Sequence, residues 1–238
     1  MCTVTFIPTE KGFHFTSSRD EKASRKTIVP TRYELNGQAI YFPKDELAGG
    51  TWFAVSENEK AACLLNGAYE NHQKMPSYTK SRGVVLLESF QYSSPIEFEK
   101  KVNLQGVEPF TLLLLDFRNQ QLNSFYELIW DGKKKYFSQL PTTENLIWSS
   151  ATLYSSEVRK KREEIFRKWL MNNLNFEDKN ILHFHNQKHG LAKAEDILMK
   201  GDGNLMTLSI SQLQFNSEEI HFNYLDVLQD ETHTISIQ

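Results

Sequence analysis

The chain has 238 residues, 39% of them hydrophobic, and its formal net charge is -3 from 27 basic and 30 acidic side chains. This length fits a single domain over residues 1–238, large enough to bury a core without disulfide staples. The balanced charge excludes a general affinity for nucleic acid, and the longest strongly apolar run, residues 110–115, is too short to span a membrane.

Strand patterns dominate the first third of the chain. Polar or β-branched residues alternate with apolar ones over residues 3–7 and again over 12–16, and the turn residues between them predict a hairpin. Gly49-Gly50 and residues 56–59 are turn signals between later strands. Those strands are predicted over residues 39–42, 51–55 and 61–65.

Two helices are predicted in the middle of the chain. The first follows Ser81, because Val84 and Leu87 recur on one helical face. The second begins at Ser94-Pro95, where a capping residue precedes a proline at the first helical position. A buried strand over residues 110–115 and a hairpin around Asp131-Gly132 are also predicted, the hairpin pairing residues 123–130 with 135–140.

The second half contains the clearest helix, over residues 157–174. Apolar residues recur there at helical spacing, and a charged run that includes Arg159 and Arg162 is expected to face solvent. Another helix is predicted over residues 193–199, and residues 183–185 (His-Phe-His) alternate as in an exposed strand. Final strands are predicted over residues 205–215, 219–224 and 232–237. Runs of strands with helices grouped between them indicate an α+β fold.

The amino-terminal segment suggests both a compartment and a chemistry. Residues 1–8 lack the basic and long apolar parts of a secretory signal, so we expect a cytoplasmic protein. With only two cysteines there is no disulfide framework, and Cys63 alternates within an apolar strand as a small buried hydrophobe would. Cys2 differs, because removal of Met1 would give it both a thiol and a free α-amine.

An α-amine has a reference pKa of about 7.7–8.0 and can serve as the base for a thiol on the same residue. Arg19 is expected to stabilise the thiolate of Cys2, and Asp20 to hold the amine, if the predicted hairpin brings them back toward residue 2. The alternative is an incidental cysteine on an edge strand beside a solvated turn.

Several short segments, in order and at matching spacing, resemble the NRDE family, the family of the transport and Golgi organisation 2 protein. The resemblance covers roughly the first ninety residues and includes residues 81–83 (Ser-Arg-Gly). The other segments are Met1-Cys2-Thr3-Val4, Ser18-Arg19-Asp20-Glu21, Ala48-Gly49-Gly50-Thr51-Trp52 and Leu65-Asn66-Gly67. That family is in turn similar to amino-terminal nucleophile hydrolases of the choloylglycine and penicillin V acylase type.

The resemblance implies a four-layer αββα sandwich and a Cys-dependent amidase or acyl hydrolase acting on non-peptide C–N bonds. Cys2 would be the nucleophile, Arg19 and Asp20 would tune and orient it, and Asn66 would donate to the oxyanion. The expected partner is a small acyl amide, and no cofactor or metal is required.

Candidate residues for the lining of the substrate site come from two parts of the chain. Gly50, Thr51 and Trp52 either line a ligand cleft or form a tight turn with a packed tryptophan. Ser18 stands where the family name has asparagine, and Ser150 stands where relatives tend to carry another asparagine. The late arginine of the acylases has no counterpart in the last predicted strand.

These departures favour a second interpretation of the same resemblance. The chain would then bind or traffic a lipid, acyl-coenzyme A or haem without catalysis, in a pocket inherited from a hydrolase. The histidines at 183, 185 and 189 do not complete a metal site, because no cysteine or carboxylate joins them. Haem ligation by one of them, or by His72, is a weaker alternative.

Overall fold

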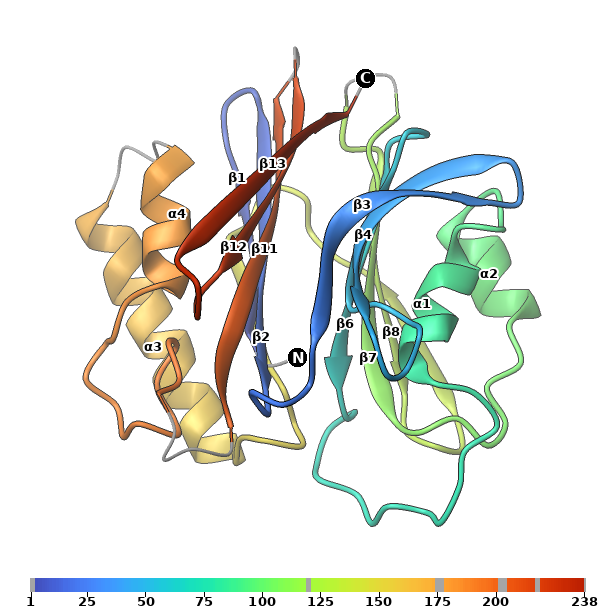
Figure 1. Ribbon diagram of the computed structural model, residues 1–238, viewed down its shortest axis with the longest axis horizontal. Coiled ribbons are helices and arrows are strands. Elements are labelled where there is room, and N and C mark those ends of the chain that lie inside the picture. The colour runs from blue at the N-terminus through green and yellow to red at the C-terminus, as the bar shows by residue number, and fades with distance from the viewer. Residues whose placement is uncertain (1–2, 119–120, 174–177, 201–204, 217–218, 238) are drawn as a thin grey trace. The chain divides into compact units, whose positions relative to one another are not determined.

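The computed structural model describes residues 3–118, 121–173, 178–200, 205–216 and 219–237. Contacts divide the chain into two compact units, the first formed by residues 1–25 and 144–238 and the second by residues 26–143. Each unit contains one antiparallel sheet with two helices packed against it (Figure 1). The assignment of residues 1–238 to a single domain stays a prediction.

The first unit is built on a six-stranded sheet that contains the predicted amino-terminal hairpin. Its strands, in spatial order, are β10 (Leu146–Ser149), β1 (Thr3–Pro8), β2 (Gly12–Glu21), β11 (Met206–Asn216), β12 (Ile220–Asp226) and β13 (Glu231–Ile237). The hairpin of β1 and β2 is confirmed, and its turn is closed by the Thr9 amide donating to the Gly12 carbonyl at 2.9 Å. Strand β2 runs further than predicted, so Arg19 and Asp20 lie within it.

Helices α3 (Ser156–Asn172) and α4 (Asp178–His185) cover one face of this sheet. The long helix is confirmed, whereas the strand predicted at 183–185 is wrong because these residues end α4. Ile181 and Phe184, three residues apart, share the buried face of α4 and pack with Ile7 and Phe166.

The helix predicted over residues 193–199 is also wrong, because the Asp196 side chain organises a loop there. The Asp196 carboxylate accepts hydrogen bonds from the backbone amides of His189, Gly190 and Ile197, at distances between 2.7 and 3.1 Å. An aspartate that satisfies the surrounding backbone in this way competes with helix formation.

The second unit is built on a seven-stranded meander. Its strands, in spatial order, are β3 (Thr27–Leu35), β4 (Gln38–Asp45), β5 (Phe53–Ser56), β6 (Lys60–Asn66), β7 (Phe110–Asp116), β8 (Ser124–Trp130) and β9 (Lys135–Gln139). All of them except β3 lie where strands are predicted. Cys63 is fully buried in β6, as expected of a small hydrophobe.

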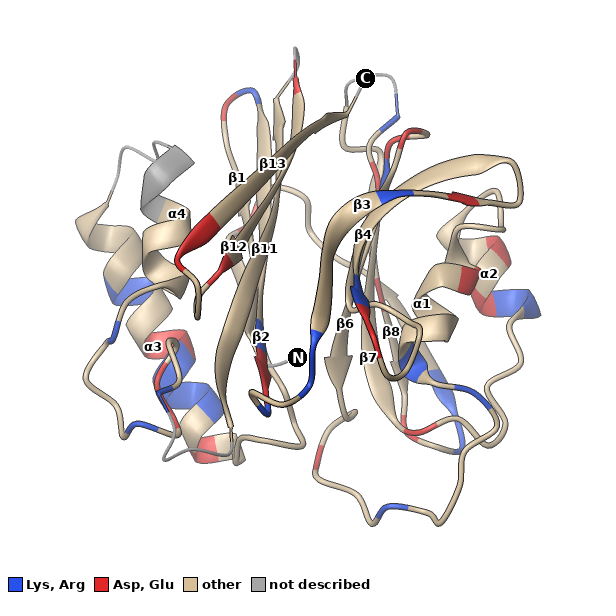
Figure 2. Ribbon diagram, viewed as in Figure 1, with Lys and Arg blue, Asp and Glu red and all other residues tan. Residues whose placement is uncertain are grey.

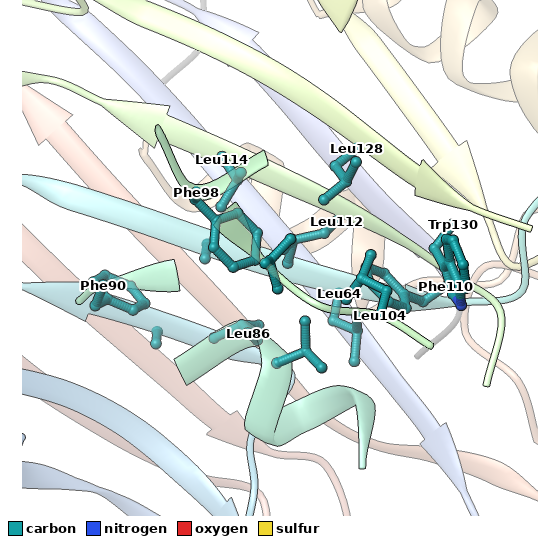
Figure 3. Close-up of a cluster of buried hydrophobic side chains, with 14 of the residues drawn as sticks. Leu64, Leu86, Phe90, Phe98, Leu104, Phe110, Leu112, Leu114, Leu128 and Trp130 are labelled. Atoms are coloured by element: carbon teal, nitrogen blue, oxygen red, sulfur yellow. The ribbon is translucent and has the colours of Figure 1, made fainter. Parts of the chain in front are cut away.

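Helices α1 (Arg82–Ser89) and α2 (Pro95–Lys101) begin at the predicted caps. The Ser81 hydroxyl accepts from the Val84 amide, and the Ser94 hydroxyl accepts from the Glu97 amide at 3.2 Å. The core between these helices and the sheet is apolar, with Leu86 of α1 near side chains from β6 and β7 (Figure 3). No helix in the described ranges is long and apolar enough to cross a membrane.

Candidate functional site

Cys2, the predicted nucleophile, lies outside the described residues. Strand β1 begins at the next residue, Thr3, which pairs with Ser18 of β2. Ser18 directly precedes Arg19 and Asp20, and all four of these described side chains are buried. The hairpin therefore brings the predicted Ser18-Arg19-Asp20 segment beside the residue that follows Cys2.

Arg19 and Asp20 point to opposite faces of β2, as neighbouring residues in a strand do. A β-bulge in β11 preserves this separation in the next strand, where Thr207 pairs with Asp20 and Ser209 pairs with Arg19. Because Leu208 is the extra residue of the bulge, Thr207 can share a face of the sheet with Asp20, and Ser209 can share the other face with Arg19. Bulges of this kind are common beside active sites, where they redirect side chains.

The Asp20 carboxylate is held by two hydroxyl groups. Thr207 donates its hydroxyl to Oδ1 at 2.6 Å, and Tyr154 donates its phenol to Oδ2 at 3.0 Å. The Thr207 oxygen in turn accepts from the Met199 amide at 2.9 Å. Asp20 is therefore a buried acceptor with a fixed orientation, as required of a group that holds an amine. Arg19 donates to the Arg25 carbonyl at 3.2 Å, which ties the end of β2 to the segment that follows.

Replacing Thr207 with valine should lower the free energy of unfolding by about 2 kcal/mol, because the Asp20 carboxylate and the Met199 amide each lose a buried partner. Urea unfolding at neutral pH measures this change. Thr207→Ser keeps the hydroxyl and should lose clearly less stability. Equal losses in both variants would show that the methyl group, and not the hydroxyl, matters at this position.

Ser18 makes a contact that is not predicted from the sequence. Its hydroxyl lies 2.8 Å from Nδ1 of His185, and Nε2 of the same ring lies 2.8 Å from the Thr5 hydroxyl. Burial, with smaller contributions from the nearby His189 and Arg162, lowers the pKa of His185 to about 3. The neutral ring donates through one nitrogen and accepts through the other.

The sequence pattern predicts that Arg162 faces solvent. This prediction is wrong, because the Arg162 side chain is fully buried. Its Nη1 donates to the Thr3 hydroxyl at 2.7 Å, and its guanidinium carbon lies 3.6 Å from the centre of the Tyr154 ring. Other charged residues of both signs lie along α3, as Figure 2 shows. A lone inward-facing cation in such a run leaves no distinct periodic signal.

Ser150, another predicted site residue, follows β10 directly. The preceding residue, Ser149, pairs with Thr3, so β10 borders the same end of β1. The Ser150 side chain is fully buried, and its hydroxyl lies 3.0 Å from that of Thr152. The first unit thus gathers Ser18, Arg19, Asp20 and Ser150 around the start of β1.

The other predicted site residues belong to the second unit. Gly50 packs its backbone against Gly83 of α1, and the Thr51 hydroxyl lies 2.6 Å from the Pro43 carbonyl oxygen, to which it donates. Trp52 is buried. Asn66 is the last residue of β6, which matches the strand-end position implied for an oxyanion donor. Their roles in a site stay predictions.

No group of three or more histidine, cysteine, aspartate or glutamate side chains is arranged for metal binding within the described ranges. Both ring nitrogens of His185 are hydrogen-bonded to hydroxyl groups, and Nε2 of His189 lies 2.9 Å from the Phe184 carbonyl oxygen. These histidines therefore act within the packing of α4 and the following loop.

Solved structures with a similar fold include a hydrolase and an acylase. A mutant of the conjugated bile acid hydrolase from Clostridium perfringens superposes with a TM-score of 0.58 at 10% identity, covering 100% of this chain and 92% of that one. Penicillin V acylase from Agrobacterium tumefaciens gives a TM-score of 0.58 at 9% identity, covering 100% and 86%. At such identities the likeness shows the fold alone, and it confirms the predicted α+β fold of amino-terminal nucleophile hydrolases.

Sequence comparison identifies the family. A search of the curated proteins found no match. The model of the family described as Transport and Golgi organisation 2 matches residues 1–232, which is nearly the whole chain. The chain therefore belongs to the Transport and Golgi organisation 2 family.

Proposed function

We propose that this protein is an acyl hydrolase that cleaves the non-peptide C–N bond of a small acyl amide, with Cys2 as the nucleophile after removal of Met1. The observation that carries the proposal is the arrangement of Arg19 and the doubly hydrogen-bonded Asp20 on a strand paired with Thr3, the residue next to Cys2. The hydrolase and acylase with similar folds support the reaction class. The absence of a disulfide framework supports a cytoplasmic location.

The proposed reaction proceeds through a thioester. The Cys2 sulfur attacks the amide carbonyl carbon while its α-amine accepts the thiol proton, and Asn66 donates to the oxyanion that forms. The C–N bond then breaks, and the proton passes from the α-amine to the leaving amine. Water, deprotonated by the same amine, hydrolyses the thioester and releases a carboxylic acid and the free thiol.

The other residues have supporting roles in this scheme. Arg19 stabilises the thiolate, and Asp20 orients the α-amine. Ser18, Gly50, Thr51, Trp52 and Ser150 are proposed to line the substrate site. Because the hydroxyl of Ser18 already contacts His185, we expect its contribution to be positional.

Turnover of a panel of acyl amides of different chain length tests the proposal. Cys2→Ala should reduce kcat/KM by at least about a thousandfold, because the nucleophile is removed. Cys63→Ala is the matched control, since it removes the buried cysteine of β6 and should retain activity. Equal turnover by the parent and Cys2→Ala would rule out this mechanism.

A second candidate function is ligand binding without catalysis, for a lipid, acyl-coenzyme A or haem. The specific observation in its favour is that Ser18 and Ser150 are buried hydroxyls bonded to His185 and Thr152, and neither offers an amide donor. Equilibrium titration with acyl-coenzyme A and with haem, for the parent and Trp52→Ala, tests this function. Lack of saturable binding of either ligand would exclude it.

A further inference from the structure

Arg162 of α3 is a buried cation whose described hydrogen-bond acceptors are all neutral carbonyl and hydroxyl oxygens. Its guanidinium donates to the carbonyls of Glu195 at 2.9 Å and Asp196 at 2.6 Å, and to the hydroxyls of Thr3 at 2.7 Å and Ser149 at 3.4 Å. A guanidinium stays protonated in proteins, and burying such a charge without a carboxylate is costly. Its retention inside the first unit calls for a functional reason.

The partners of Arg162 lie next to two groups of the proposed site, the start of β1 and Asp20. Thr3 is the residue after Cys2, and Ser149 pairs with Thr3 across the neighbouring strand. The Tyr154 ring stacks on the guanidinium, and its phenol donates to Asp20. One side chain therefore fixes the start of β1 and the group that orients Asp20.

We propose that Arg162 is a positioning residue for Cys2, which anchors the first residue of β1 and Tyr154 behind Asp20 and uses its buried charge to stabilise the Cys2 thiolate. This inference rests on the proposed function for the identity of the nucleophile. A buried cation is poorly screened by salt, and it favours a thiolate and a neutral α-amine over their protonated forms. Both effects prepare an amino-terminal cysteine for attack.

The effect of the Arg162 charge on the pKa of the Cys2 thiol must be distinguished from the effects of other groups near the start of β1. The titratable or charged side chains described there are Arg19 and Asp20 on β2, Tyr154 before α3, Arg162 on α3, His185 on α4, and His189, Glu195 and Asp196 in the loop after α4. His185 has a pKa of about 3 and stays neutral above pH 5, so it does not titrate in the range in which a thiol does. Variants at Arg162 alone therefore report on its own charge.

The test is the pH dependence of Cys2 alkylation by iodoacetamide, followed by peptide mass spectrometry on the chain lacking Met1. Arg162→Met and Arg162→Gln should raise the apparent pKa of the Cys2 thiol by on the order of one pH unit, and Arg162→Lys should stay close to the parent. Arg167→Met removes an exposed arginine from the same helix and should leave the profile unchanged. Cys63 belongs to the second unit, so folding of the first unit is checked by urea unfolding of each variant.

The variants give separate answers about charge and folding. If Arg162→Met shows no cooperative urea unfolding of the first unit, Arg162→Gln, which keeps a hydrogen-bonding amide, is the neutral variant to compare with Arg162→Lys. An unchanged thiol pKa in the folded neutral variants, or equal rises in the Gln and Lys variants, would overturn the proposal. Since alkylation needs no substrate, absence of acyl amide turnover would contradict the proposed function and leave this result standing.

Discussion

Replacement of His185 with phenylalanine should lower the free energy of unfolding at pH 7 by about 3 kcal/mol. The ring of His185 bridges the buried hydroxyls of Thr5 and Ser18, and phenylalanine fills similar space without serving either one. A buried polar group that loses its partner costs about 1–3 kcal/mol. Urea unfolding measures the change. His183→Phe, on the exposed side of the same helix, is the matched control and should be nearly neutral.

The same variant should change how stability depends on pH. Burial lowers the pKa of His185 from 6.5 to about 3, so between these values the unfolded chain binds a proton that the folded chain does not. Stability from this group is complete above pH 6.5 and is lost as the pH falls toward 3, by about 5 kcal/mol at most. His185→Phe should show a shallower decline over that range. A decline as steep as that of the parent would assign the acid sensitivity to other groups.

Gly83→Ala is expected to destabilise the second unit by about 3 kcal/mol, through overpacking of one backbone segment against another. A Cβ atom at Gly83 would lie 2.6 Å from the carbonyl oxygen and 2.8 Å from the amide nitrogen of Thr51. A Cβ atom at Gly50 would likewise lie 2.7 Å from the Gly83 carbonyl carbon. Both obstacles are backbone, so they cannot move aside as a flexible side chain would.

Thermal or urea unfolding measures the effect of Gly83→Ala, with Val84→Ala at the exposed neighbouring position as a control that should be nearly neutral. Parent-like stability of Gly83→Ala would show that the contact with Thr51 relaxes easily. The expected loss would explain why a Gly-Gly-Thr segment and a Ser-Arg-Gly segment occur together, since their backbones touch. For Gly50 this supports a packing role, whether or not the segment also binds substrate.

Elements with strong local signals could be predicted from the sequence. The alternating residues of β1 and β2, the serine caps of α1 and α2 and the continuous apolar run of β7 each occur as expected. Strand β3 carries no such pattern, because much of it is exposed and Pro30 interrupts its pairing with a bulge. Strand β10 has only four residues and depends on β1 for its pairing.

The candidate site shows the same limit of local patterns. Cys2, Arg19 and Asp20 can be proposed from order and spacing because they lie within twenty residues of one another. The partners that hold them come from distant segments: Thr207 reaches Asp20 across 187 positions, and His185 reaches Ser18 across 167. No spacing rule encodes such contacts, and only packing of α3 and α4 on the sheet turns Arg162 and His185 inward.

Cys2, with its own α-amine freed, is the proposed nucleophile. Intact mass of the purified chain before and after treatment with a p-nitrophenyl acyl ester, followed by peptide mapping, tests this claim most directly. We expect a chain without Met1 that gains one acyl group on Cys2, and no acyl group on the Cys2→Ala variant. Retention of Met1 in the reactive chain, or an acyl group on any other residue, would contradict it.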